Sequence, residues 1–232
     1  ILLKNLDNFK QVLEYNHYNK IYFYRFSHNL VPLATCPYVS FDYIRPYQNN
    51  WEKLGKLVKK YKIRLDSHPD QYCVLNSLNP KVVENTITHL EFHQKLYQAM
   101  KLNGKAIIHV GSGLPNKNEA KKRFIENFRI LGEKEKNMIL LENDDKIFDV
   151  DDVLELCQLL KIPMVLDYHH NRCCHRKELT KEKIKEIFAT WENESLPPKV
   201  HFSSPKSMKE KRSHSEYLDK DDEDNILKYT TF

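Results

Sequence analysis

In Met138-Ile-Leu-Leu-Glu-Asn-Asp-Asp145, four apolar residues run directly into four polar ones. A short apolar run without alternation is typical of a strand that is buried on both faces of a parallel sheet. The side chains that follow the run, beginning with Glu142, then stand at the carboxyl end of that strand. In parallel β/α folds, ligands bind at that end. This segment therefore predicts carboxylates gathered at the ligand-binding edge of a sheet.

Four other strand candidates end in the same way, on residues that can bind metal ions. They are Ile63–Ser67 before His68, Ala106–Ile108 before His109, Pro163–Leu166 before Asp167, His169 and His170, and Val200 before His201. A single histidine at a strand end is more often a structural residue than a ligand. Five such ends in one chain instead indicate a metal site that many strands build together.

The predicted elements alternate between strands and helices along the chain. Ile21–Arg25 is a sixth strand candidate, and helical apolar spacing covers residues 6–15, 51–61, 81–100, 118–131, 150–160 and 180–191. Asn50 is expected to cap the second of these helices, and residues 205–225 are expected to form an exposed loop.

This alternation is typical of a parallel sheet covered by helices. No Gly-x-Gly-x-x-Gly follows the first strand, which argues against a dinucleotide-binding fold. We therefore expect an α/β protein with a (β/α)8 TIM-barrel fold, in which residues 1–232 form a single domain that lacks the first and last strands of the barrel.

The composition excludes several classes of protein. The 232 residues suffice for a sizeable core, and the net charge of +5 permits a nucleic-acid partner without identifying one. No run of about 18 apolar residues occurs, and the first residues lack the zones of a signal peptide. The five cysteines include no Cys-x-x-Cys pair, so reduced thiols are expected. We expect an intracellular protein that is neither secreted nor bound to a membrane.

The candidate ligands are imidazoles and carboxylates, without a cysteine. Such sets suit zinc, manganese or iron, and one carboxylate can bridge two ions. Two ions ~3.5–4 Å apart activate a water and stabilise a leaving oxygen, which is the arrangement used for phosphodiester hydrolysis. The seven candidates are His68, His109, Glu142, Asp167, His170, His201 and His214.

The other histidines and two arginines are assigned to the surface. We expect exposed positions on helices or loops for His17, His89, His93 and His175. A solvated basic patch is expected at Arg172, His175 and Arg176, with contact to DNA phosphates as the alternative.

Seven segments stand out along the chain: Tyr24-Arg25-Phe26-Ser27 with Leu30-Val31-Pro32, Ser67-His68-Pro69-Asp70-Gln71-Tyr72, Leu75-Asn76-Ser77, Ile108-His109-Val110-Gly111, Leu141-Glu142-Asn143-Asp144-Asp145, Asp167-Tyr168-His169-His170 and Lys199-Val200-His201-Phe202-Ser203. In sequence and in order they resemble the UV-damage endonuclease family, a relative of endonuclease IV among the xylose-isomerase-like barrels. The His-Pro-Asp-Gln-Tyr and Leu-Glu-Asn-Asp-Asp strings are specific, because endonuclease IV does not share them.

The resemblance implies a barrel that holds two or three divalent ions, Mn²⁺ first and Zn²⁺ as the alternative. It implies one site at His68, His109 and Glu142, with Glu142 bridging to a second site. Asp167 and His201 would complete the second site, and His170 and His214 would belong to a third. The resemblance also implies that Lys199 is a carboxylated lysine that acts with Glu142 in catalysis. Gln71 and Tyr72 would be the pair that probes damaged DNA.

The chain departs from the family pattern in four places. Cys36-Pro37 stands where the family has His-Pro, and the loop after Gly111 reads Ser-Gly-Leu-Pro-Asn-Lys. The family's opening strand and its closing strand, which carries a further metal-binding Glu, have no counterpart in residues 1–232. If the protein ended at Phe232, the second metal would lack that carboxylate, which would weaken the case for catalysis.

The resemblance implies a metal-dependent DNA repair endonuclease that nicks the backbone 5′ of UV photoproducts. We expect it to act as a monomer on damaged double-stranded DNA, without an organic cofactor. The alternatives are an apurinic-site endonuclease of the endonuclease IV type, a sugar isomerase barrel, and a catalytically inactive DNA-binding remnant. A sugar isomerase gives no reason for the Gln71-Tyr72 loop.

Overall fold

The computed structural model describes residues 1–69, 72–174 and 179–230. The chain folds into two compact units, and each is described by itself. Unit 1 comprises Ile1–Leu75, Asn79–Ile108 and Ile130–Ile139, and unit 2 comprises Asn76–Leu78, His109–Arg129 and Leu140–Phe232. The prediction of a single domain stays a prediction.

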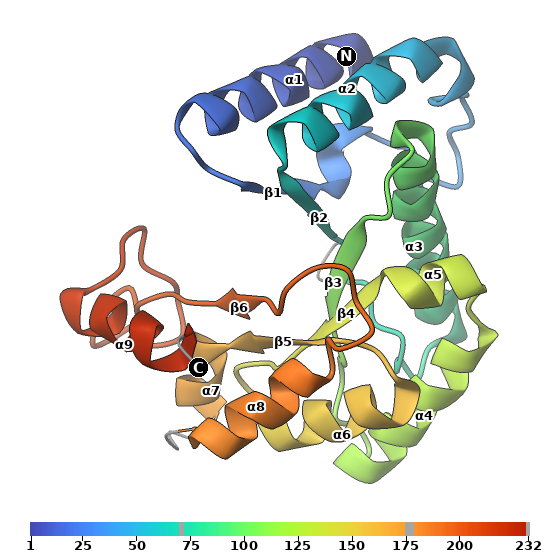
Figure 1. Cartoon of the computed structure of the whole chain (residues 1–232). Coiled ribbons are helices and arrows are strands. Elements are labelled where there is room, and N and C mark those ends of the chain that lie inside the picture. Colours follow the sequence, from blue (N-terminus) through green and yellow to red (C-terminus); the bar gives the residue numbers. More distant parts are fainter. Residues whose placement is uncertain (70–71, 175–178, 231–232) are drawn as a thin grey trace. The chain divides into compact units, whose positions relative to one another are not determined.

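Parallel strands alternate with helices along the chain (Figure 1), and the described residues contain six strands. This confirms the predicted α/β class. The strands are β1 Phe23–Ser27, β2 Arg64–His68, β3 Lys105–His109, β4 Ile139–Glu142, β5 Met164–Asp167 and β6 Val200–His201.

In unit 1, helices α1 (Leu2–Tyr18) and α2 (Gln48–Tyr61) lie side by side, and α2 also packs on α3 (Pro80–Met100) (Figure 1). The remaining helical elements of this unit are the short 3₁₀ turns η1 (His28–Leu30) and η2 (Arg45–Tyr47) and the helix α5 (Glu133–Met138). An added Cβ at Gly55 would lie 1.9 Å from the carbonyl oxygen of Met100, so only glycine permits the approach of α2 to α3.

In unit 2, helices α6 (Val150–Leu160) and α8 (Lys181–Ala189) pack beside β5 (Figure 1). The other helices of this unit are α4 (Lys117–Ile130), α7 (Tyr168–Cys174) and α9 (Lys220–Thr230). Every residue of β4 and β5 is buried, as their unbroken apolar runs predict. Side-chain caps begin two of the helices, because Asp149 accepts from the Asp152 N–H and Thr180 accepts from the Lys183 N–H.

Some predicted element bounds were wrong. β1 runs over Phe23–Ser27 instead of Ile21–Arg25, because a turn in which Lys20 has a φ of 58° separates it from α1. Helix α2 begins at Gln48, so Asn50 lies inside the helix and does not cap it. Helix α9 replaces the end of the loop expected over 205–225, and its acidic first turn suits a helix N-terminus.

Two expectations from composition can be compared with this structure. None of the helices in the described residues is both long and apolar enough to cross a membrane. The five cysteines form no disulfide with one another.

Candidate metal centre

The carboxyl ends of β4, β5 and β6 bring Glu142, Asp167 and His201 together. Their ligand atoms all lie within 4.8 Å of one another. β5 and β6 end level, since Asp167 is in register with His201, whereas Glu142 is in register with Val165, two residues before Asp167. Both carboxylates are buried, with Glu142 only 2% exposed and Asp167 3%. Unit 2 therefore contains three of the predicted ligands in one cluster.

The electrostatics of this cluster favour a cation. Burial opposes the charge of Glu142, but the neighbouring His201, whose Nδ1 lies 2.5 Å from Oε1, holds the pKa of Glu142 well below its ordinary range. Burial and the charge of Glu142 raise the pKa of Asp167. Two carboxylates that are buried this close together repel each other, and a divalent ion would neutralise both.

Backbone carbonyls orient three of the predicted histidine ligands. The Nδ1 atom of His109 donates to the carbonyl of Glu142 at 3.2 Å, and Nδ1 of His170 donates to the carbonyl of Asn143 at 2.9 Å. In unit 1, Nδ1 of His68 lies 2.7 Å from the carbonyl of Pro69. Each bond leaves Nε2 as the unprotonated atom, which is the form that binds a metal ion. The donor set thus fits the divalent ion that its chemistry implies.

His109 and His170 lie next to the carboxylates in unit 2. Nε2 of His109 is 3.5 Å from Oε2 of Glu142, and the rings of His109 and His170 have centroids 5.6 Å apart. The backbone N–H of His170 donates to Oδ1 of Asp167 at 2.8 Å. His68 belongs to unit 1, where it ends β2, so its place among the ligands stays a prediction.

His214 approaches this group from the segment after β6. Its ring centroid lies 5.6 Å from that of His170, and the assignment of both residues to a third ion stays a prediction. Nδ1 of His214 is hydrogen-bonded to Oγ of Ser203 at 2.5 Å. His214 thus has a polar support of its own beside the cluster.

His169 was missed as a residue of this region. It is 1% exposed, its ring lies 4.8 Å from that of His214, and burial lowers its pKa. Its Nε2 atom lies 3.3 Å from the carbonyl of Arg212 and 3.7 Å from Sγ of Cys173. The signal was present in the sequence, because His169 adjoins His170 directly after the Asp167 strand.

The other predicted site residues are only partly described. Lys199 is 9% exposed and immediately precedes β6, two residues before His201. Tyr72 is 73% exposed, as a residue that contacts a partner must be. Gln71 lies outside the described residues. The roles assigned to these three residues stay predictions.

Two of the surface assignments were wrong. His93 is fully buried in α3, between the rings of Phe26 and Phe92. Arg172 is only partly exposed and is already paired, because its Nη1 atom lies 2.6 Å from Oδ1 of the buried Asp222. The remaining members of that patch, His175 and Arg176, lie outside the described residues.

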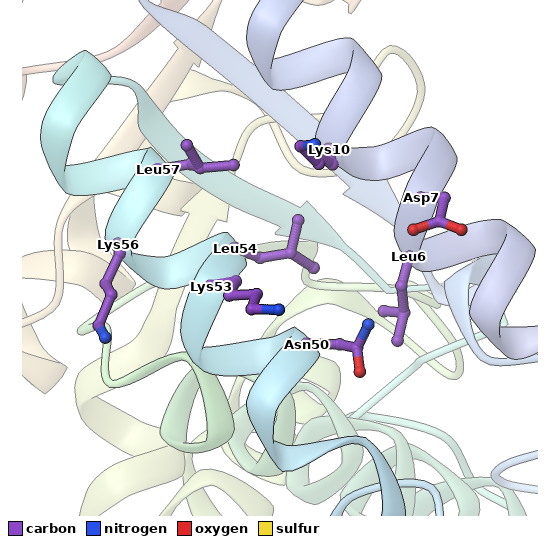
Figure 2. A pocket seen from close by; sticks show the side chains of 8 residues that line it. All are labelled: Leu6, Asp7, Lys10, Asn50, Lys53, Leu54, Lys56 and Leu57. Atoms are coloured by element: carbon purple, nitrogen blue, oxygen red, sulfur yellow. The ribbon is translucent and has the colours of Figure 1, made fainter.

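Unit 1 contains a separate pocket between α1 and α2. Leu6, Leu54 and Leu57 supply apolar walls, and Asp7, Lys10, Asn50, Lys53 and Lys56 supply polar groups (Figure 2). Its volume is about 400 Å³. Figure 2 shows Asn50 and Lys53 pointing from α2 toward α1, while Lys56 points away. None of the predicted site residues lines this pocket.

The fold and the cluster together define the class, an endonuclease IV-like partial (β/α) barrel with histidines and carboxylates at its strand ends. Endonuclease IV from Thermus thermophilus has this fold, with a TM-score of 0.60 at 15% identity over 84% of this chain and 71% of its own. The crystal structure of SacUVDE is much more similar, with a TM-score of 0.93 at 30% identity over 99% of this chain and 78% of its own.

The chain belongs to the family described as UV-endonuclease UvdE, which it matches over residues 1–228. The UV DNA damage endonuclease of Bacillus thuringiensis subsp. konkukian (strain 97-27) is 41% identical over 218 residues, which cover 93% of this chain and 69% of that protein. The protein of the same name from Bacillus cereus (strain B4264) is 39% identical over 221 residues, or 94% and 70%. The chain is therefore an endonuclease of a DNA-repair family, as the resemblance implied.

Proposed function

We propose that this endonuclease cuts double-stranded DNA on the 5′ side of UV photoproducts and needs divalent metal ions to do so. The observation that carries the proposal is the buried cluster of Glu142, Asp167 and His201 at the ends of three adjacent strands. Burying charged carboxylates costs free energy unless a cation neutralises their charge. Membership of the UvdE family supplies the substrate class.

Two or three ions, Mn²⁺ first and Zn²⁺ as the alternative, would be held by this part of the chain. We assign Glu142, Asp167 and His201 to the central ligands and His170 and His214 to a further ion, with His68 and His109 added from the family resemblance. The ions would supply Lewis-acid activation of water and stabilisation of the leaving oxygen. The histidine Nδ1 bonds to backbone carbonyls would keep Nε2 available throughout turnover.

Lys199 is assigned to carboxylation by carbon dioxide. Its neutral amine would add to CO₂ and release one proton, which leaves a carbamate anion. A buried ammonium on the same strand face as a metal ligand would be repelled by the ions, whereas the carbamate would bind them. The conversion therefore matches the burial of Lys199 and its spacing from His201.

Tyr72 and Gln71 are assigned to the DNA contact that detects damage. An exposed tyrosine ring can enter the duplex at a distorted step and stack on a base, and an adjacent amide can bond to base edges. Damage weakens stacking, so opening the duplex costs less at a photoproduct. We propose that the chain acts in this way inside the cell, as a monomer and without an organic cofactor.

A nicking assay tests the proposal. Supercoiled plasmid that is UV-irradiated, depurinated or untreated is incubated with the protein and Mn²⁺, beside the Glu142→Ala variant. Nicking that is confined to irradiated plasmid and lost in the variant supports the proposal. Nicking of depurinated plasmid alone identifies an apurinic-site endonuclease instead, and binding of damaged DNA without nicking of any plasmid identifies an inactive DNA-binding protein.

A further inference from the structure

Residues 204–215 of unit 2 fold back on themselves as a hairpin arm that begins and ends beside the cluster. The N–H of Lys206 donates to the carbonyl of Ser213 at 2.7 Å, and the N–H of Ser215 donates to the carbonyl of Ser204 at 2.8 Å. Pro205 pairs with His214 in an antiparallel bridge. The returning limb therefore carries His214, one of the residues assigned to metal binding.

Arg212 fixes this returning limb to the loop after β4. Its Nε donates to Oδ2 of Asp145 at 2.8 Å, and its Nη2 donates to the carbonyl of Asp145 at 3.1 Å. On the other side, the carbonyl of Arg212 lies 3.3 Å from Nε2 of His169. Arg212 thus holds the arm against both the loop after β4 and helix α7, and its guanidinium is already paired with Asp145.

The tip of the arm is cationic. Lys206 lies 3.1 Å from Glu210, so the only acidic residue of the arm is already paired. Lys209 and Lys211 are exposed, and neither forms an ion pair with any residue that the structure describes. Two unpaired ammonium groups stand three and five residues from His214, on a segment that is otherwise anchored.

We infer that Lys209 and Lys211 bind the DNA backbone close to the bond that is cut, an inference that rests on the proposed function. Five residues of chain span at most about 18 Å, so both ammonium groups lie within a few phosphates of a strand held at the cluster. Each strand of duplex DNA presents one negative charge per about 3.4 Å of helix axis. A lysine that meets a phosphate adds affinity without reading sequence or damage.

The test compares Lys209→Gln/Lys211→Gln with the charge-matched control Lys181→Gln/Lys185→Gln, which alters two exposed lysines of α8. Both pairs are made in a Glu142→Gln background so that the DNA stays intact. Binding to a duplex with one thymine dimer, and to the unmodified duplex, is measured from about 50 to about 200 mM KCl. A third variant, Lys209→Arg/Lys211→Arg, retains both charges.

The inference predicts that the arm variant lowers the slope of log affinity against log salt by about 1.8 on both duplexes, because each phosphate that a lysine no longer neutralises removes about 0.9 from the slope. The arginine variant keeps the original slope, and the α8 control changes it by less than about 0.5. An unchanged slope in the arm variant, or an equal change in the α8 control, overturns the inference.

The two proposals can fail separately. If the wild-type protein nicks irradiated plasmid but the arm variant keeps the wild-type slope, the inference about the arm is wrong and the proposed function stands. If the slope falls as expected while the wild-type protein nicks no irradiated plasmid, the arm contacts DNA and the proposed function is wrong.

Discussion

The Nδ1 atom of His201 lies 2.5 Å from Oε1 of Glu142, although β5 separates the strands that carry them. The two side chains converge because all three parallel strands finish at this edge of the sheet, and Asp167 at the end of β5 completes the group. Glu142 therefore lies beside both a second carboxylate and a histidine. We therefore expect the charge of Glu142 to contribute most to metal binding and catalysis.

Replacement of Glu142 by Gln should lower both Mn²⁺ affinity and the nicking rate by at least about 100-fold, since loss of outer-shell partners alone costs roughly 10–100-fold at metal sites. The change keeps the side-chain shape and removes the charge. Titration calorimetry with Mn²⁺ and plasmid nicking measure the two effects. Glu155→Gln, an exposed residue of α6, serves as the control and should change neither by more than about twofold. Wild-type Mn²⁺ affinity in Glu142→Gln would exclude Glu142 as a ligand.

Asp222→Asn should reduce the free energy of unfolding by about 1–3 kcal/mol. Asp222 is buried, accepts from Oγ of Ser204 at 2.6 Å and pairs with Arg172. Breaking a buried ion pair costs about 3–5 kcal/mol, but Arg172 is one-third exposed and water screens part of that cost. Urea denaturation gives the value, and the exposed Asp224→Asn is the matched control. Equal stability of the two variants would contradict a structural role for this pair.

Gly55→Ala should destabilise unit 1 by about 1–3 kcal/mol, the usual cost of overpacking. The new methyl group would lie 1.9 Å from the Met100 carbonyl oxygen, and backbone cannot move aside as a side chain can. Gly132→Ala is the control, because its new methyl group would meet the flexible end of Glu135. Thermal or urea unfolding compares them, and a harmless Gly55→Ala would show that α2 and α3 do not need this close approach.

Acid should destabilise the protein through His93. Burial first, and then the neighbouring His89, His28 and His68, lower the pKa of His93 to about 3. Below pH of about 6.5, His93 binds a proton in the unfolded chain but stays neutral in the folded protein. The free energy of unfolding therefore falls as the pH falls, by about 2 kcal/mol between pH 6.5 and 5. Above pH of about 7 this contribution disappears.

The measurement for His93 is urea unfolding of wild type and His93→Leu at pH 7 and pH 5, without metal ions. The leucine variant should lose less stability on acidification, by about 2 kcal/mol. His17→Leu, which alters a histidine on the surface of α1, should behave as wild type. The same acid sensitivity in wild type and His93→Leu would show that His93 is protonated in the folded state.

The sequence predicted the strands best where both faces are buried. The apolar runs of β4 and β5 have no amphipathic alternative, so their ends at Glu142 and Asp167 could be located to the residue. The predicted bounds of β1 were two residues too early, because its mixed aromatic and polar residues do not mark where the preceding turn ends. Pairing with β2, which no local pattern contains, sets its register.

Helix α7 and the burial of His93 and His169 could not be predicted from the sequence, because contacts with other elements determine them. The segment after Asp167 looks like a polar loop, and its helical turn depends on the Asp167 carboxylate accepting the His170 N–H. His93 faces the core of unit 1 although histidine usually marks a surface. In both cases a contact with another element decides the conformation, so composition and periodicity carry no signal for it.

The central claim is metal-dependent cutting on the 5′ side of a photoproduct, and mapping the cut tests it most directly. A duplex with a single thymine dimer and an end label is incubated with chelator-treated protein, with and without Mn²⁺, and the product length is read on a sequencing gel. We predict one product, cut immediately 5′ of the dimer and formed only with Mn²⁺. A cut elsewhere on the strand, or the same product without added metal, would contradict the account.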